Sequence, residues 1–209
     1  MKDFDATSYL AAKGDFNTAD EKRLISYIRN ADKVVSILDV GCGDGRLTKR
    51  VQSACPNCLV TGIDNSSDQI TLSKAAPSSI TFELVGIENF HPSQAFDMVY
   101  SFYAFPHMPK SLLPAALAGV RRSLKRGGSF YLFTNICLFD TSTATPEDQE
   151  ACDIEFLDHF HSQINLIDMS EMQTLLTNAG FSIGHDEGLE TGARVKEYGD
   201  MISWLFVLR

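Results

Sequence analysis

The chain has 209 residues, of which 44% are hydrophobic, and this length and composition can bury one sizeable core. Its formal net charge is −9. Because phosphate contacts need clustered Lys and Arg, this balance disfavours a nucleic-acid partner or an anionic membrane surface. No apolar stretch is long enough to span a bilayer, and the first residues lack the apolar core of a secretion signal. We therefore expect a single cytoplasmic domain over residues 1–209.

Apolar runs of strand length alternate with helical patterns along most of the chain. The first part predicts helices over 18–31, 45–54, 66–77 and 110–126, and strands over 34–40, 59–64, 80–85, 96–101 and 129–133. The pattern loosens over 135–164, where a short helix begins near 145. A helix that Ser170 caps and Gly180 ends comes next. Two final strands, near 181–187 and 200–208, are close enough for a hairpin.

Strands that alternate with helices at this spacing imply a parallel sheet that is covered on both faces. No internal repeat and no low-complexity tract interrupts the pattern. The sequence therefore predicts an α/β fold. We expect a doubly wound, mostly parallel seven-stranded sheet with helices on both faces and a C-terminal antiparallel hairpin.

The five cysteines include one close pair, Cys55 and Cys58, in a C-x-x-C arrangement. Such a pair is typical of a redox couple or of half a zinc site. A structural zinc needs a second ligand pair, and Cys137 with Cys152 lacks that spacing. The Pro-Asn between the two thiols is typical of a turn from a helix into a strand. We therefore expect free buried thiols and no metal site.

The most informative stretch is an apolar run that ends in Asp39 and is followed by glycines at alternate positions, Gly41, Gly43 and Gly45. Glycine serves where the backbone takes a positive φ or approaches a ligand closely. A dinucleotide fingerprint needs a third glycine where this chain has Arg46, and no phosphate loop is present. Because a carboxylate at the strand end would repel a diphosphate, the turn favours a ligand that carries an ammonium and a sulfonium.

The glycine pattern that follows Asp39 closely resembles motif I of the class I S-adenosylmethionine (AdoMet) dependent methyltransferases. The Phe-Asp-Met-Val run at 96–99, the Ala-Gly-Phe turn at 179–181 and the closing hairpin resemble later parts of the same family. The resemblance therefore covers 34–208. It implies that AdoMet is the cofactor and that a methyl group passes to a small-molecule acceptor by in-line displacement.

The resemblance assigns the first cofactor contacts to the ends of two strands. Asp39 would hold the ammonium group of AdoMet, and the backbone at Gly41 and Gly43 would approach its methionine portion. Asp64 would accept hydrogen bonds from both ribose hydroxyls, which is the role of the acid about 20 residues on in dinucleotide folds. A turn or capping aspartate is the plain alternative for Asp64.

The adenine site departs from the family's pattern. The family commonly has an acid after the third strand that accepts from the adenine amino group, whereas this chain has Gly86, Ile87 and Glu88 there. We expect the backbone of Ile87 to meet the adenine, with a register shift that brings in Glu88 as the alternative. Asn65 would pack near the adenine, and the carbonyl of Ser101, at the end of the fourth strand, would contact the ammonium group.

No obligatory catalytic residue is visible, because the sulfonium donor is already activated and positioning supplies most of the rate. A general base helps if the acceptor is a hydroxyl or a thiol. His107 is the candidate, since it resembles the second histidine of an Ala-Leu-His-His-x-Pro run in many small-molecule members. The alternative is a loop histidine packed beneath the cofactor. Phe102 and Tyr103 precede it and are expected to line the acceptor site.

Two further segments are expected to form walls of the acceptor site. The N-terminal part, 1–31, combines a lid that carries Tyr9 with the first helix. The variable acceptor-side segment, 136–165, carries His159. The aromatic residues of these segments favour a small apolar or aromatic acceptor.

Two rival functions stay open at this point. One is a protein or peptide methyltransferase, and the other is an AdoMet-binding protein without transfer activity, which the missing adenine acid suggests. The segment that begins at Ser101 lacks the Asn/Asp-Pro-Pro-Tyr/Phe sequence of amino-methylating nucleic-acid enzymes. Nothing in the sequence indicates the oligomeric state.

Overall fold

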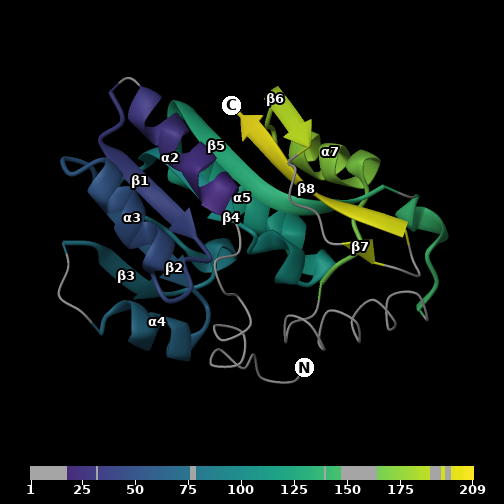
Figure 1. The fold of residues 1–209 in the computed structure, drawn as a ribbon, viewed down its shortest axis with the longest axis horizontal. Coiled ribbons are helices and arrows are strands. Elements are labelled where there is room, and N and C mark those ends of the chain that lie inside the picture. The colour runs from purple at the N-terminus through teal and green to yellow at the C-terminus, as the bar shows by residue number, and fades with distance from the viewer. Residues whose placement is uncertain are drawn as a thin grey trace.

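The computed structural model describes residues 18–31, 33–75, 79–138, 140–146, 164–188, 194–195 and 199–209. Their strands form a sheet in the order β3-β2-β1-β4-β5-β8-β6, and β7 pairs with β8 beside this path (Figure 1). The strands are β1 Ser36–Val40, β2 Leu59–Asp64, β3 Thr81–Leu84, β4 Phe96–Phe102, β5 Leu124–Cys137, β6 Ile183–Gly188, β7 Arg194–Val195 and β8 Gly199–Leu208.

The first five strands of the sheet, β3, β2, β1, β4 and β5, run parallel to one another. Strand β8 lies antiparallel to both β5 and β6. The predicted mostly parallel sheet with a C-terminal antiparallel pair is therefore confirmed, and the short β7 is an addition that the sequence did not predict. The strand order reverses between β1 and β4. In open α/β sheets, ligands bind outside the carboxyl ends of the strands at such a switch point.

Helices cover both faces of the sheet (Figure 1), and each face has its own cluster of buried apolar side chains. One cluster contains Leu117 and Leu176 of α5 and α7, and the other contains Leu24, Val51 and Ile70 of α2, α3 and α4. The α-helices are α2 Thr18–Asn30, α3 Arg46–Ala54, α4 Ser67–Ser73, α5 Leu113–Ser123 and α7 Met169–Asn178. The short 3-10 turns are η1 Ile87–Asn89, η2 Phe105–His107, η3 Lys110–Leu112 and η4 Thr141–Thr143.

Several element boundaries differ from the sequence prediction, and the end of α5 and the start of α7 show why. The helix expected over 110–126 ends at Ser123, and β5 starts already at the next residue. Buried Leu124 pairs with Phe96 of β4, which draws the end of the expected helix into the sheet. The cap of α7 is Asp168, whose side chain accepts a hydrogen bond from the Glu171 N–H, and not the expected Ser170.

The two close cysteines, Cys55 and Cys58, form a disulfide, so the expectation of free thiols is wrong for this pair. The turn between α3 and β2 brings their Cα atoms to 5.4 Å, a separation that a disulfide spans. Cys42 and Cys137 are free and buried. In the part of the chain that the structure describes, no helix is long and apolar enough to cross a membrane. The same part contains no group of three or more His, Cys, Asp or Glu that could hold a metal ion.

Candidate functional site

The glycine loop between β1 and α3 stands at the carboxyl edge of the sheet, beside the switch point. Gly41, Gly43 and Gly45 have φ values of 77°, 55° and 75°, the left-handed region that glycine adopts without strain. The backbone N–H of Gly41 donates to the Ile63 carbonyl at the end of β2, at 2.9 Å. A Cβ at Gly41 would overlap the Cβ of Ala104, so the loop and the turn after β4 lie in direct contact.

Asp64 ends β2 with its carboxylate fixed beside this loop. Its Oδ2 accepts the backbone N–H of Gly43 and its Oδ1 accepts that of Ser66, both at 2.9 Å. Burial raises the pKa of Asp64, and these backbone hydrogen bonds oppose the rise. An ionised carboxylate has about four acceptor sites. Both oxygens can therefore still accept from a pair of adjacent ligand hydroxyls.

Asp39 is buried within β1, beneath the glycine loop. It is 2% exposed, and its Oδ2 accepts hydrogen bonds from the hydroxyls of Thr48 and Tyr100, both at 2.6 Å. Burial and the Asp39 charge raise the pKa of Tyr100, which keeps the phenol neutral and donating. One carboxylate oxygen of Asp39 thus braces β1 against α3 and β4.

Cys42, the residue between the first two glycines, has an unreactive thiol. Burial first, and then the charges of Asp39 and Asp64, raise the pKa of this thiol. The thiolate is the nucleophilic form of cysteine, and here it is suppressed. Cys42 therefore serves as a small apolar packing residue beneath the loop.

Gln69, in the first turn of α4, is a site residue that the sequence analysis missed. Its side chain is 3% exposed, and its Oε1 is buried with no hydrogen-bond partner in the described residues. This oxygen lies 3.6 Å from the place that a Cβ at Gly43 would take. A buried acceptor without a donor costs about 1–3 kcal/mol. A donor group bound beside the loop would remove that cost. A polar residue at an inward-facing helix position is the only sequence signal for it.

The turn after β3 carries the residues that the sequence analysis assigned to the adenine site. Ile87 is 1% exposed in η1, and Gly86 precedes it in extended conformation. The Glu88 carboxylate folds back over Gly86, where a Cβ would overlap its oxygens, and accepts a hydrogen bond from Asn89 Nδ2 at 3.0 Å. Asn65 is exposed directly after β2.

The end of β4 carries the other candidate residues. Ser101 is fully buried, and its hydroxyl donates to the Val40 carbonyl of β1 at 3.0 Å. The rings of Phe102 and Phe133 lie 5.0 Å apart, and Phe102 meets Tyr103 edge-on at the same distance. His107 is exposed in η2.

Tyr103 has a left-handed backbone, with φ of 58°, which is rare for a residue with a side chain. Its hydroxyl donates to Oδ2 of Asp20, which is 2% exposed in α2, at 2.7 Å. The phenol therefore ties the first described helix to the acceptor end of β4. Two expected acceptor residues, Tyr9 and His159, lie outside the described residues.

The site thus occupies the carboxyl edge of β1, β2 and β4. Residues 37–128 match the family described as methyltransferase domain. This stretch of the chain is similar to a methyltransferase domain. The matched range of the domain runs from β1 into β5 and includes the glycine loop, Asp64, Glu88 and His107. The class I methyltransferase resemblance expected from the sequence is confirmed.

Two curated methyltransferases are similar to this chain at low identity. A putative methyltransferase of Invertebrate iridescent virus 6 is 26% identical over 133 residues, which are 64% of this chain and 49% of that protein. Trans-aconitate 2-methyltransferase of Escherichia coli is 29% identical over 100 residues, or 43% of this chain and 40% of that enzyme. This chain therefore spans less than half the length of these two curated relatives.

The fold agrees with that of a solved enzyme. The mycolic acid cyclopropane synthase CmaA1, solved in complex with SAH and CTAB, superposes with a TM-score of 0.68. The superposition covers 91% of this chain and 82% of that chain, at 18% identity. At this identity the likeness concerns the fold alone, and it supports the predicted α/β class.

Proposed function

We propose that this protein is an AdoMet-dependent methyltransferase that acts on a small-molecule acceptor. The single observation that carries the proposal is the Asp64 carboxylate, held by two backbone N–H groups beside a left-handed glycine loop at the switch point of the sheet. The relatives that match the domain are named methyltransferases, and the cyclopropane synthase of the same fold is solved with SAH.

The described residues fit AdoMet in shape and charge. The glycines at 41 and 43 let the loop backbone approach the methionine portion, and Asp64 offers acceptor sites to the ribose hydroxyls. Asp39 contributes negative charge near the ammonium group, and the backbone carbonyl of Ser101 contacts the same group. The buried Gln69 oxygen offers one more acceptor next to the loop. When bound, AdoMet supplies a methyl group activated on a sulfonium.

The adenine assignment is part of this proposal. Ile87 supplies backbone groups and an apolar contact from η1, and the Glu88 carboxylate over Gly86 is placed to accept from the adenine amino group. This position of Glu88 supports the register shift that the sequence analysis held as its second choice. Asn65 lies next to Asp64 and packs near the same ring.

For the acceptor, the rings at the end of β4 support a small apolar or aromatic molecule. Phe102 and Tyr103 are the described members of this wall, and we assign Tyr9 and His159 to it as the sequence expects. His107 is exposed after β4, as a general base for a hydroxyl or thiol acceptor must be. An acceptor that needs no deprotonation would use positioning alone.

The negative net charge disfavours binding to nucleic acid or to an anionic membrane. A cytoplasmic location is also part of this proposal. A protein or peptide methyltransferase is the second candidate function, and an AdoMet-binding protein without transfer activity is the third. If the protein methylates a fractionated metabolite extract and not a protein extract, it is a small-molecule methyltransferase and neither of the two other candidates.

Calorimetry with AdoMet and with its demethylated product tests the proposal. We expect both to bind with one site per chain, and we expect labelled methyl groups to appear in the small-molecule fraction of an extract. Failure to bind either compound would contradict the cofactor assignment. Binding without transfer to any fraction would favour the protein without transfer activity.

The variant Gln69→Leu tests the residue that the sequence did not reveal. Loss of one hydrogen bond to the ligand should weaken AdoMet binding about fivefold, from a net contribution of about 1 kcal/mol. The free energy of unfolding without ligand should not fall, because leucine removes a buried oxygen that has no described donor. Calorimetry and urea unfolding measure the two quantities.

Gln173→Leu is the matched control, because Gln173 is an exposed glutamine of α7. It should leave AdoMet affinity unchanged. A Gln69→Leu protein that unfolds more easily yet binds AdoMet normally would show that Gln69 only packs.

A further inference from the structure

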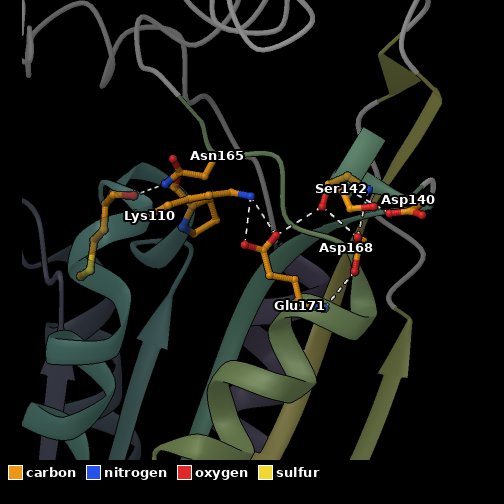
Figure 2. A network of polar contacts seen from close by, with 9 residues as sticks. Lys110, Asp140, Ser142, Asn165, Asp168 and Glu171 are labelled. Carbon is orange, nitrogen blue, oxygen red and sulfur yellow. Dashed lines mark hydrogen bonds and ion pairs between the residues drawn. The ribbon is translucent and has the colours of Figure 1, made fainter. Parts of the chain in front are cut away.

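The loop that carries His107 is fastened to a distant part of the chain by Asn165. The backbone N–H of Asn165 donates to the Pro106 carbonyl at 2.8 Å, and its side-chain Nδ2 donates to the same carbonyl at 3.1 Å. Nδ2 also donates to the carbonyl of Met108 (Figure 2). One asparagine therefore hydrogen-bonds to the residues on both sides of His107. It is 59 residues from Pro106 and 57 residues from Met108 in sequence.

A second fastening joins the same loop to α7. Lys110 Nζ donates to both carboxylate oxygens of Glu171, at 3.0 Å and 2.8 Å (Figure 2). Glu171 Oε2 also accepts a hydrogen bond from the Thr141 hydroxyl at 3.2 Å. The loop after β4 and the loop after β5 thus meet at one carboxylate of α7.

The segment that bears Asn165 is itself firmly held. Ile164, Leu166 and Ile167 are each 2% exposed, and the Cys137 N–H at the end of β5 donates to the Ile167 carbonyl at 2.9 Å. The Asp168 Oδ2 accepts two hydrogen bonds from Thr141, one from its backbone N–H at 2.9 Å and one from its hydroxyl at 2.8 Å. Asn165 therefore bonds to the His107 loop from a segment that is itself buried and hydrogen-bonded to β5.

We infer that Asn165 is a positioning residue that holds His107 in place at the acceptor end of the sheet, with the Lys110–Glu171 pair as a second fastening of the same loop. This inference rests on the proposed methyl transfer at that end. Methyl transfer depends on placing the acceptor atom in line with the methyl group, so a small displacement of the neighbouring loop lowers turnover. Most proposed cofactor contacts lie on the loops after β1, β2 and β3, and Ser101 lies within β4, whereas the hydrogen bonds of Asn165 go to Pro106 and Met108.

The expected signature is thus a split between turnover and cofactor affinity. In Asn165→Leu, which keeps the side-chain size but removes the donor, exchange of the His107 and Met108 amides should become about tenfold faster. The rate of labelled methyl transfer to an active metabolite fraction should fall about tenfold, and the half-saturating acceptor concentration should rise. Calorimetric affinity for AdoMet should stay within about twofold of the unchanged protein.

Asn178→Leu is the matched control, because Asn178 is an exposed asparagine at the end of α7. It should change neither amide exchange in the loop nor turnover. Lys110→Met is a second, milder variant. Its lysine is 41% exposed, so it should fold and should give a smaller change of the same kind.

Three results separate the possibilities. Unchanged exchange of the His107 and Met108 amides in Asn165→Leu would overturn the inference. Equal losses of turnover and AdoMet affinity in both Asn165→Leu and Lys110→Met would also overturn it, because a general loss of structure lowers both. Absence of AdoMet binding by the unchanged protein would refute the proposed function, while the exchange measurement would still decide whether Asn165 holds the loop.

Discussion

Asp64→Ala should weaken AdoMet binding about tenfold or more, because a charged carboxylate that accepts from two ribose hydroxyls is lost. The structure gives this residue a fixed orientation, since the N–H groups of Gly43 and Ser66 each hold one carboxylate oxygen at 2.9 Å. Calorimetry measures the change in affinity. An unchanged dissociation constant would rule out the ribose role.

Asp44→Ala is the control for this variant. Asp44 also lies on the glycine loop, but its Oδ1 accepts the Arg46 N–H at 3.1 Å and so caps the loop locally. It should leave the affinity unchanged. A second control uses pH: since burial raises the pKa of Asp64, the ionised form is lost at a higher pH than in an ordinary aspartate. Affinity should therefore fall as pH drops toward that pKa, and Asp64→Asn should remove this dependence.

Gly41→Ala should lower the free energy of unfolding by about 2–5 kcal/mol and abolish AdoMet binding. Two costs combine: about 1–2 kcal/mol for a side chain in the left-handed region, and about 1–3 kcal/mol for overpacking. The overpacking arises because the new Cβ overlaps that of Ala104. Urea unfolding and calorimetry measure the two effects.

Gly127→Ala separates the two costs. Gly127 has a φ of 80°, close to that of Gly41, but a Cβ there meets no atom within 4 Å. It should therefore show the backbone cost of about 1–2 kcal/mol alone, with normal AdoMet affinity. If the two variants lose the same stability, the contact between the glycine loop and the turn after β4 does not matter.

The parts of this site that sequence reasoning found are those whose meaning is local. Asp39 and the three glycines follow one apolar run, and Asp64 ends the next, so a single strand–turn–helix unit places them without knowledge of the rest. The same holds for most helices and strands. Periodicity in a short window decides them, and the cap of α4 at Ser66 is visible in four residues.

The parts that it missed depend on contacts between distant residues. Leu124 becomes a strand residue because Phe96 pairs with it. The Oε1 of Gln69 has no donor among the described residues, and its place beside the glycine loop is visible only once α4 packs there. Asn165 meets the His107 loop from 57 residues away, and no pattern along the chain joins them. The Asp39 bonds to Thr48 and Tyr100 likewise need three elements in place.

The cysteine pair shows a different limit. Its spacing allows a disulfide, a thiol pair or a metal half-site, and only the three-dimensional turn, with 5.4 Å between the Cα atoms, decides among them.

A crystal structure of the protein grown with S-adenosylhomocysteine tests the central claim most directly. We expect both ribose hydroxyls to donate to the Asp64 carboxylate, with the amino-acid tail of the ligand lying along the backbone at Gly41 and Gly43. A ligand bound elsewhere, or a ribose that makes no contact with Asp64, would contradict this account.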